Sequence, residues 1–198
     1  MELLLLARHG ESEYSARGLV NSDPSVEVAL TPAGVEQALE LGRTLAATAV
    51  DLCVTSELWR TRQTAELALA GRDVPVETWA DLNELQAGEY EGRALEEYRP
   101  WAWAAGSAEP IPGASESRLA AVERYTRAYR ALLERPEAAV LAVAHGLPIA
   151  YLLGALEGRA PAARMDRPIE YARAYPADAH ALAGAVAVLE GWCAAPDW

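Results

Sequence analysis

Short apolar runs alternate with segments of helical periodicity along most of the chain. The apolar runs predict buried strands at residues 2–7, 51–55, 74–78 and 138–144. Apolar residues at helical spacing predict helices at residues 32–49, 57–70, 94–104, 117–134, 147–156 and 178–192. Strands that alternate with helices form parallel sheets. We therefore expect an α/β fold, a three-layer sandwich with a mostly parallel central sheet and helices on both faces.

Local signals support several of these boundaries. Thr31 precedes Pro32, which is a favourable helix start, while Ser56 is placed to cap the next helix and Gly71 to end it. No internal repeat, low-complexity tract or linker interrupts the pattern. Residues 1–198 are therefore expected to form a single domain.

The charge and composition exclude several classes of function. The chain has 17 basic and 29 acidic residues, a formal net charge of −12, and neither lysine nor phenylalanine. An acidic balance argues against a nucleic-acid partner, because phosphate backbones attract basic surfaces. A Walker-type phosphate loop, a Schiff base and a pyridoxal phosphate anchor each need a lysine, so these mechanisms are excluded.

The sequence predicts a cytoplasmic protein without a membrane partner. The apolar run from Leu3 to Ala7 is too short to span a bilayer, and its charged neighbours Glu2 and Arg8 do not suit a secretory signal. The two cysteines, Cys53 and Cys193, have neither a metal-binding nor a redox spacing, which excludes a disulfide framework.

Two of the three histidines occur in matching contexts. His9 and His145 each follow an apolar strand and precede a glycine, Gly10 or Gly146. Ligands of parallel sheets bind beyond the carboxyl ends of the strands, so both imidazoles are expected to face one crevice. The glycines would let the backbone approach a ligand closely. The third histidine, His180, belongs to no motif and is interpreted as structural or exposed.

Two arginines are expected at the same crevice. Arg8 adjoins His9, and Arg60 lies in the first turn of the helix predicted after the strand at 51–55. Cations prefer the carboxyl ends of helices, so an arginine at this position makes sense if it and the helix dipole both address an anion. Two arginines and two histidines at strand ends therefore indicate a phosphate site.

The motif Arg8-His9-Gly10-Glu11-Ser12 resembles the signature of the histidine phosphatase superfamily, which includes phosphoglycerate mutases. Further motifs agree in order and placement from residue 3 to about residue 150. They are Leu30-Thr31-Pro32-Ala33-Gly34 with Gln37-Ala38, Ser56 to Thr64, Leu82-Asn83-Glu84, Gly88-Glu89-Tyr90-Glu91-Gly92, Pro112-Gly113 with Glu116-Ser117, and Val143-Ala144-His145-Gly146. The last 40 residues add only helices.

The resemblance implies a mechanism in which His9 attacks phosphorus and becomes phosphohistidine. His9 must be neutral to attack, and the nearby arginine charges are expected to lower its pKa. Arg8, Arg60 and His145 would hold the phosphoryl oxygens, and Glu84 would protonate the leaving oxygen and then activate water. Neither a metal nor another cofactor is required, because arginines and an imidazolium supply the positive charge.

Three further residues are candidates for substrate binding. Family members often carry asparagine six residues after the nucleophile, where this chain has Ser15. Serine can donate a hydrogen bond but reaches less far, so Asn21, further along the same loop, is an alternative. Gly146, directly after His145, is the third candidate.

Other mechanisms fit the residues less well. Cys53 and Arg60 are separated by one residue more than a cysteine phosphatase loop allows, and Cys53 lies within an apolar strand. No paired Asp-x-Asp follows a strand, and three scattered histidines do not make a zinc site. Within the family, a phosphatase is favoured over a cofactor-dependent mutase, because such mutases are longer between the acid and the second histidine and use a lysine. A non-catalytic module that binds a phosphorylated ligand is the remaining alternative.

The expected partner is a small phosphate ester, and a homodimer is left open. Residues 89–113 are expected to cover the pocket, with acidic residues and two tryptophans, Trp101 and Trp103. An acidic, aromatic lid would favour a monoester with an apolar or neutral body over a bisphosphate. Arg93 and Arg99 in the same segment weaken that inference.

Overall fold

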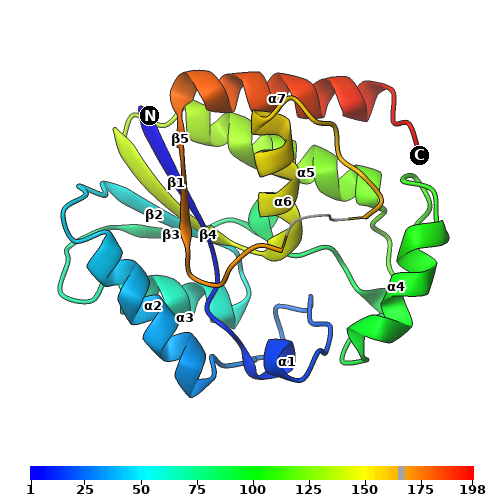
Figure 1. Ribbon diagram of the computed structural model, residues 1–198, viewed down its shortest axis with the longest axis horizontal. Helices are drawn as coiled ribbons and strands as arrows, with labels where there is room; N and C mark the ends of the chain where they lie inside the picture. Colours follow the sequence, from blue (N-terminus) through cyan, green and yellow to red (C-terminus); the bar gives the residue numbers. More distant parts are fainter. Residues whose placement is uncertain (165–167) are drawn as a thin grey trace.

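The computed structural model describes residues 1–164 and 168–198, and these build a five-stranded sheet in the order β3-β2-β4-β1-β5 (Figure 1). Neighbouring strands are parallel except for β5, which pairs antiparallel with β1. The strands are β1 (Leu3–Arg8), β2 (Leu52–Thr55), β3 (Val76–Thr78), β4 (Ala139–Ala144) and β5 (Ala174–Asp178). The mostly parallel sheet predicted from the sequence is confirmed.

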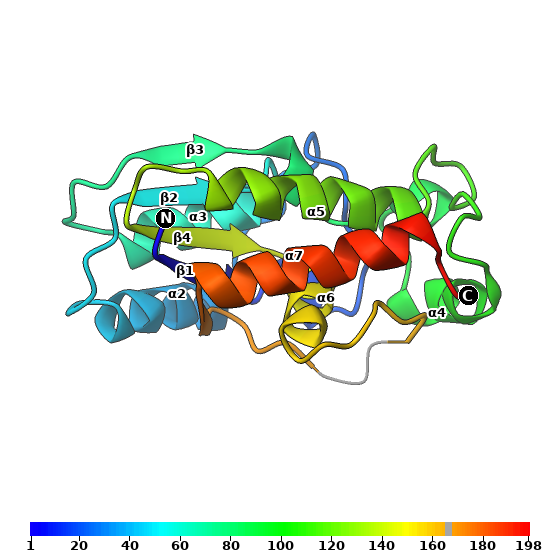
Figure 2. The same ribbon diagram turned by 90° about the horizontal axis from the view of Figure 1, so that it is seen from above.

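Helices cover both faces of this sheet, which confirms the three layers (Figures 1 and 2). One face carries α2 (Pro32–Thr44) and α3 (Trp59–Ala68), and the other carries α5 (Arg118–Leu133), α6 (Gly146–Leu156) and α7 (Ala179–Ala194). The remaining elements follow strand ends or lie in the long segment before α5. They are α1 (Glu13–Ala16), α4 (Leu95–Ala104) and the 3-10 turns η1 (Ala80–Leu82) and η2 (Gly88–Tyr90).

The strands are apolar throughout because both of their faces are buried. In β1, Leu4 and Leu6 pack with α5, α6 and α7, whereas Leu5 and Ala7 pack with α2 and α3. Tyrosine supplies aromatic bulk that phenylalanine would otherwise provide, and Tyr125 in α5 is completely buried. None of the described helices is long and apolar enough to cross a membrane.

Two helix boundaries and one strand differ most from those expected. α2 ends at Thr44 rather than at residue 49, and the chain turns before β2. α3 begins at Trp59 with Leu58 as its N-cap, so Ser56 is not the capping residue. β5 was not predicted, because Pro176 within it argues against a strand; an edge strand tolerates proline since one side of its backbone is unpaired.

Candidate active site

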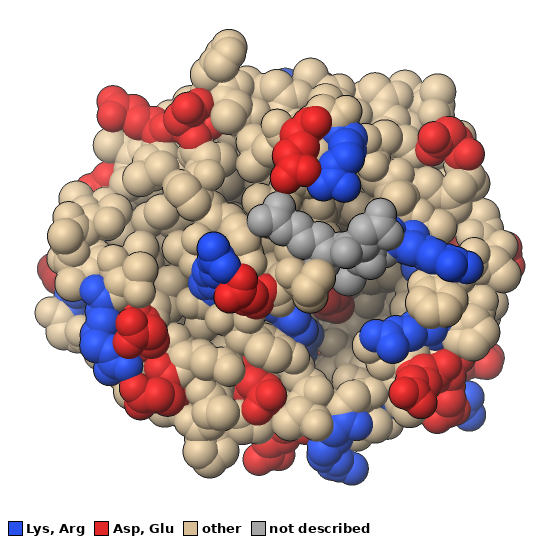
Figure 3. Space-filling model, viewed as in Figure 1, with Lys and Arg blue, Asp and Glu red and all other residues tan. Residues whose placement is uncertain are grey.

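A cavity of about 480 Å³ lies at the carboxyl ends of β1 and β4, with α4 forming part of its wall. The hollow is visible in Figure 3, where arginine atoms lie at its edge. Seven of the residues expected at the site line it: Arg8, His9, Ser15, Asn21, Arg60, Glu84 and Gly146. The parallel sheet therefore brings together residues from four of the motifs, with Ser15 and Asn21 from the segment after the first motif, as the sequence predicts.

His9 has one unprotonated ring nitrogen, Nε2, which carries the lone pair. Its Nδ1 lies 2.7 Å from the carbonyl oxygen of Gly10, and because a carbonyl only accepts, Nδ1 carries the proton. Its Nε2 accepts a hydrogen bond from Nε of Arg60 at 3.1 Å. Burial holds the pKa of His9 well below its ordinary value, and the charges of Arg60 and Arg8 add to that effect. The ring is therefore neutral, as expected, although burial is the larger cause.

Arg60 is a buried arginine held on several sides. Its Nη1 donates to Oδ1 of Asn21, and its Nη2 donates to the backbone carbonyl of Asn21 at 3.0 Å and to Nδ1 of His145 at 3.1 Å. Burial lowers its pKa to about 10, against the charge of Glu84, so the guanidinium stays charged at neutral pH. Asn21 therefore positions Arg60, and Glu91 in turn accepts from Nδ2 of Asn21 at 2.9 Å.

His145 lies behind Arg60 and does not line the cavity itself. Its Nε2 lies 2.8 Å from Oγ of Ser56, and its ring centroid lies 5.3 Å from that of His9. Nδ1 accepts from Arg60, so Nε2 carries the proton. Burial, followed by the charges of Arg60 and its neighbours, holds the pKa of His145 well below its ordinary value. The expected imidazolium is therefore a neutral imidazole, and Ser56 orients this histidine.

Arg8 is held by residues near the C-terminus that no sequence motif indicated. Its guanidinium stacks on the ring of Tyr171, 3.9 Å from the centroid, and its Nη1 donates to the carbonyl of Ile169 at 2.8 Å. Within the described part of the chain, Nε of Arg8 is buried without a hydrogen-bond partner. This nitrogen is therefore available to an anion in the cavity. Tyr171 leads into the unpredicted strand β5, which explains why sequence reasoning missed it.

Among the described residues, Glu84 is the only acidic one that lines the cavity. Its Oε1 accepts from the backbone N–H of Leu85 at 2.9 Å. Burial raises its pKa, while this hydrogen bond and the charges of Arg60, Arg8 and Arg124 oppose the rise. A carboxyl group with a raised pKa is suited to donating a proton near neutral pH.

Arg124 of α5 holds the loop that carries Glu84, a role that the sequence did not reveal. It donates to the backbone carbonyls of Asp81 at 3.1 Å and Asn83 at 2.8 Å. It also forms a largely buried ion pair with Glu116 at 2.8 Å, and Glu116 accepts from the backbone N–H of Gln86 at 3.0 Å. The segment on both sides of Glu84 is thus fastened to one ion pair.

The loop after His9 is fixed by backbone packing. A Cβ on Gly10 would lie 2.5 Å from the carbonyl oxygen of Gly34. The two backbones are therefore too close for a side chain at Gly10 or at Gly34. This close approach is to α2 and not to a ligand, which corrects the expectation for Gly10. A Cβ on Gly146 would meet only ordinary contacts with Arg8, so Gly146 is not required for lack of space. Oγ of Ser15 lies 2.9 Å from Oγ of Ser12, which caps α1.

The acidic residues of the segment at 89–113 do not line the cavity. Glu91 binds the backbone N–H of Ser22 at 2.8 Å as well as Asn21. Trp103 lines the cavity, whereas Trp101 packs against the core. The expectation of an acidic wall is therefore wrong, because these carboxylates bind neighbouring backbone or face solvent.

The structure offers neither a reactive cysteine nor a metal site among the described residues. Burial raises the pKa of the Cys53 thiol to about 12, which leaves no thiolate near neutral pH. His180 lies exposed on α7. The described residues contain no group of three or more histidine, cysteine or acidic side chains that could hold a metal ion.

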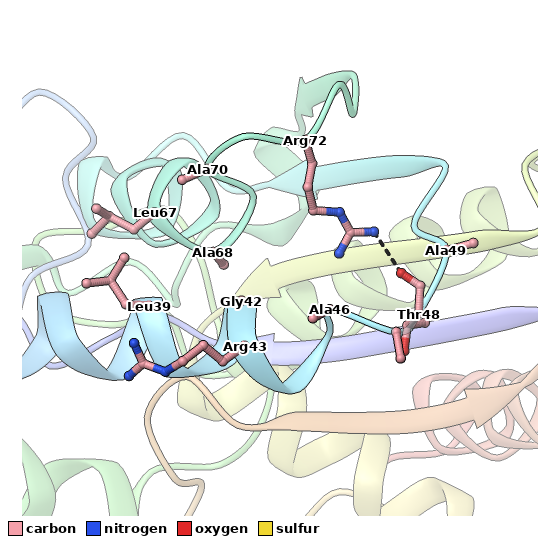
Figure 4. A pocket seen from close by; sticks show the side chains of 11 residues that line it. Leu39, Gly42, Arg43, Ala46, Thr48, Ala49, Leu67, Ala68, Ala70 and Arg72 are labelled. Carbon is pink, nitrogen blue, oxygen red and sulfur yellow. Dashed lines mark hydrogen bonds between the residues drawn. The ribbon is translucent and has the colours of Figure 1, made fainter.

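A second hollow, of about 600 Å³, lies between the ends of α2 and α3 (Figure 4). Its wall is mostly alanine and leucine. The guanidinium of Arg72 is occupied by the backbone carbonyls of Leu45 at 3.0 Å and Thr48 at 2.7 Å. Arg43 pairs with Glu36 and Glu40. This hollow therefore offers no nucleophile or acid.

Comparisons with known proteins identify relatives of this chain. A 2,3-bisphosphoglycerate-dependent phosphoglycerate mutase from Methylobacterium sp. is 34% identical over 174 residues, which cover 79% of this chain and 81% of that protein. An adenosylcobalamin/alpha-ribazole phosphatase from Salmonella typhimurium is 41% identical over 90 residues, 46% of this chain and 44% of that protein. The match to that phosphatase thus spans less than half of its length.

The structural comparison covers more of the chain. A crystal structure of a putative alpha-ribazole-5'-P phosphatase from Escherichia coli superposes with a TM-score of 0.77 at 30% identity, covering 89% of this chain and 90% of the other. Residues 4–180 match the histidine phosphatase superfamily (branch 1). The chain therefore belongs to the histidine phosphatase superfamily.

Proposed function

We propose that this chain is a metal-independent phosphatase that hydrolyses a small phosphate monoester through a phosphohistidine intermediate. The observation that carries the proposal is the state of His9, a neutral ring whose Nε2 lone pair faces Arg60 at the cavity wall. A neutral imidazole nitrogen beside a guanidinium that can bind phosphate is arranged for attack on phosphorus.

In the first step, Nε2 of His9 forms a bond to phosphorus while the bond from phosphorus to the ester oxygen breaks. Glu84 donates its proton to that oxygen, and an alcohol leaves. Arg60 and Arg8, with the unpartnered Nε of Arg8, bind the charged phosphoryl oxygens. His145, which does not line the cavity, holds Arg60 in place.

In the second step, water attacks the phosphohistidine. Glu84, now ionised, takes a proton from the water, the phosphorus–nitrogen bond breaks, and inorganic phosphate leaves with His9 restored. The backbone N–H groups at the start of α6, beginning at Gly146, lie at the cavity and favour an anion there. Ser15 and Asn21 also line it, and Asn21 acts through Arg60.

Hydrolysis is favoured over mutase-type transfer because the chain has no lysine and because its structural neighbour at 30% identity is a putative phosphatase. The identity to a phosphoglycerate mutase keeps transfer as the second candidate. A cytoplasmic location and a small-molecule partner are part of this proposal, and the family resemblance supports both.

A panel of phosphate monoesters tests the proposal. It should include alpha-ribazole phosphate, because relatives are named for it, and 3-phosphoglycerate with and without 2,3-bisphosphoglycerate. We expect release of inorganic phosphate that excess chelator leaves unchanged, that vanadate inhibits, and that His9→Ala abolishes. Isomerisation of phosphoglycerate without phosphate release would identify a mutase, and binding without turnover would identify a non-catalytic module.

A further inference from the structure

The outer part of the active-site cavity contains a second buried arginine. Arg118 is the first residue of α5, and 8% of its surface is exposed. It lines the same cavity as His9, together with Tyr98 of α4 and the backbone at Ala163. The cavity thus has a phosphate end at His9 and a second cationic group in its wall.

The position of Arg118 is unfavourable for stability. A cation at the amino end of a helix opposes the helix dipole, and a buried charge without an opposite charge carries a desolvation cost. Among the described residues, no carboxylate pairs with Arg118. Its Nη1 donates to the carbonyl of Ala163, but its Nε is buried without a hydrogen-bond partner. The contribution of Arg118 to folding therefore does not explain a buried, unpaired arginine at this position.

Two tyrosines surround this guanidinium. Oη of Tyr98 is also buried, and its O–H has no acceptor in the described part of the chain. Burial raises the pKa of Tyr98 and raises that of Tyr151 to about 12, and in both cases the charge of Arg118 opposes the rise. Both phenols therefore keep their protons at neutral pH. Arg118 and Tyr98 together offer unused hydrogen-bond donors in one wall of the cavity.

The charge of the cavity points in the same direction. Among the described residues, its lining includes four arginines, Arg8, Arg60, Arg99 and Arg118, and one acid, Glu84. A phosphoryl dianion at His9 would be matched by Arg8 and Arg60. No acid among the described lining residues would then compensate the charge of Arg118 or that of the exposed Arg99.

Resting on the proposed phosphatase function, we propose that Arg118 and Tyr98 bind a second anionic group of the substrate, a carboxylate or a second phosphate. Guanidinium and phenol groups donate charge-assisted hydrogen bonds to such oxygens. The substrate class is then a phosphate monoester with another anionic group some carbons away. This replaces the preference for a neutral body that an acidic wall would have given.

Matched esters test the proposal. The measurement compares kcat/KM for carboxyalkyl phosphates of two to six carbons with that for hydroxyalkyl phosphates of equal length, at constant ionic strength. A third series of alkanediol bisphosphates distinguishes carboxylate from phosphate as the second group. At the best chain length, the anionic ester should be favoured about tenfold or more, as expected for a charge-assisted contact.

Variants assign that preference to its residues. Arg118→Met should remove it while changing kcat/KM for the hydroxyalkyl ester less than about threefold, and Tyr98→Phe should reduce it in the same direction. Arg127→Met is the matched control, because Arg127 lies on the same helix, is exposed and pairs with Asp81 at 3.2 Å. If Arg118→Met does not fold, Arg118→Lys and Tyr98→Phe carry the test, with Tm as the check.

Equal rates for both series at every length, or equal losses on both in Arg118→Met, would overturn the second anion site alone. Absence of turnover on every ester would overturn the proposed function instead. The site is still tested in that event, because calorimetric titration of the same ester pairs into His9→Ala measures the ratio of their Kd values. A ratio near one would contradict the proposal.

Discussion

Nε of Arg60 donates a hydrogen bond of 3.1 Å to Nε2 of His9, so the guanidinium marks the nitrogen of His9 that carries the lone pair. The same guanidinium reaches Asn21 and His145. One side chain thus connects the loops after β1, β2 and β4. The charge needed for phosphate binding is placed at the nucleophilic atom before any substrate enters.

Arg60→Lys should lower kcat/KM at least a hundredfold. A lysine keeps the charge but lacks the planar fork that contacts His9, Asn21 and His145 together, and loss of one transition-state donor costs about a hundredfold or more. Arg62→Lys is the control, because Arg62 stacks over Trp59 and lies outside the cavity. Steady-state kinetics on a fast monoester measure both; similar values for the two variants would argue against this role of Arg60.

The rate should depend on pH as a bell-shaped curve. Burial lowers the pKa of His9, so the rate rises as the pH increases through that lowered value and the ring loses its proton. Burial raises the pKa of Glu84, so the rate falls as the pH increases through that raised value and the acid ionises. Glu84→Gln should remove the basic limb of the profile of kcat/KM.

The leaving group separates the role of Glu84 from a structural one. Alkyl phosphates need a proton on the departing oxygen, whereas nitrophenyl phosphate hardly does. Glu84→Gln should therefore slow alkyl esters far more than the nitrophenyl ester. Equal losses of rate on both substrates would show that Glu84 is not the general acid and that another carboxylate, such as Glu11, has this role.

Arg124→Met should reduce both stability and turnover. It leaves Glu116 charged and unpaired, which costs about 3 kcal/mol of unfolding free energy, and frees the loop of Glu84. The double variant Arg124→Met with Glu116→Met should recover stability but not turnover on alkyl esters, because the backbone carbonyls remain unheld. Urea denaturation and kinetics measure the two effects. Full recovery of turnover in the double variant would show that Arg124 acts only on stability.

The free energy of unfolding should fall as the pH drops below about 6.5, the ordinary pKa of histidine. Burial lowers the pKa of His145 in the folded protein, so the unfolded chain binds protons first as the pH falls. Each such ring contributes a loss of about 1 kcal/mol per pH unit in this range. His145→Gln should flatten the decline between pH 6.5 and 5.5 in urea titrations. An unchanged slope would contradict the neutral state assigned to His145.

Site residues could be predicted from the sequence where they directly follow a recognisable strand. His9 and His145 directly follow strands that apolar runs reveal, and the parallel order of β1, β2 and β4 then brings them and Arg60 together. Glu84 required the family resemblance, because nothing local distinguishes it from an exposed carboxylate.

The remaining positions depend on packing between distant segments. Tyr171 reaches Arg8 only because β5 pairs with β1. Pro176 within β5 makes this segment of the sequence look unlike a strand. Arg124 acts on Glu84 through backbone carbonyls, which carry no signature in the sequence. The prediction that acidic residues of the segment at 89–113 cover the cavity was wrong for a similar reason, because the composition of a segment does not determine which way its side chains point.

Trapping the covalent intermediate tests whether His9 is the nucleophile. A monoester labelled in its phosphoryl group should, on rapid alkaline quench within a turnover, leave label on the protein that is stable to base, released by acid, and located at His9 by peptide mapping. His9→Ala, with an unchanged Tm, should carry no label and keep less than about a hundredth of the activity. Turnover in His9→Ala above that level, or label found on another residue, would contradict the account.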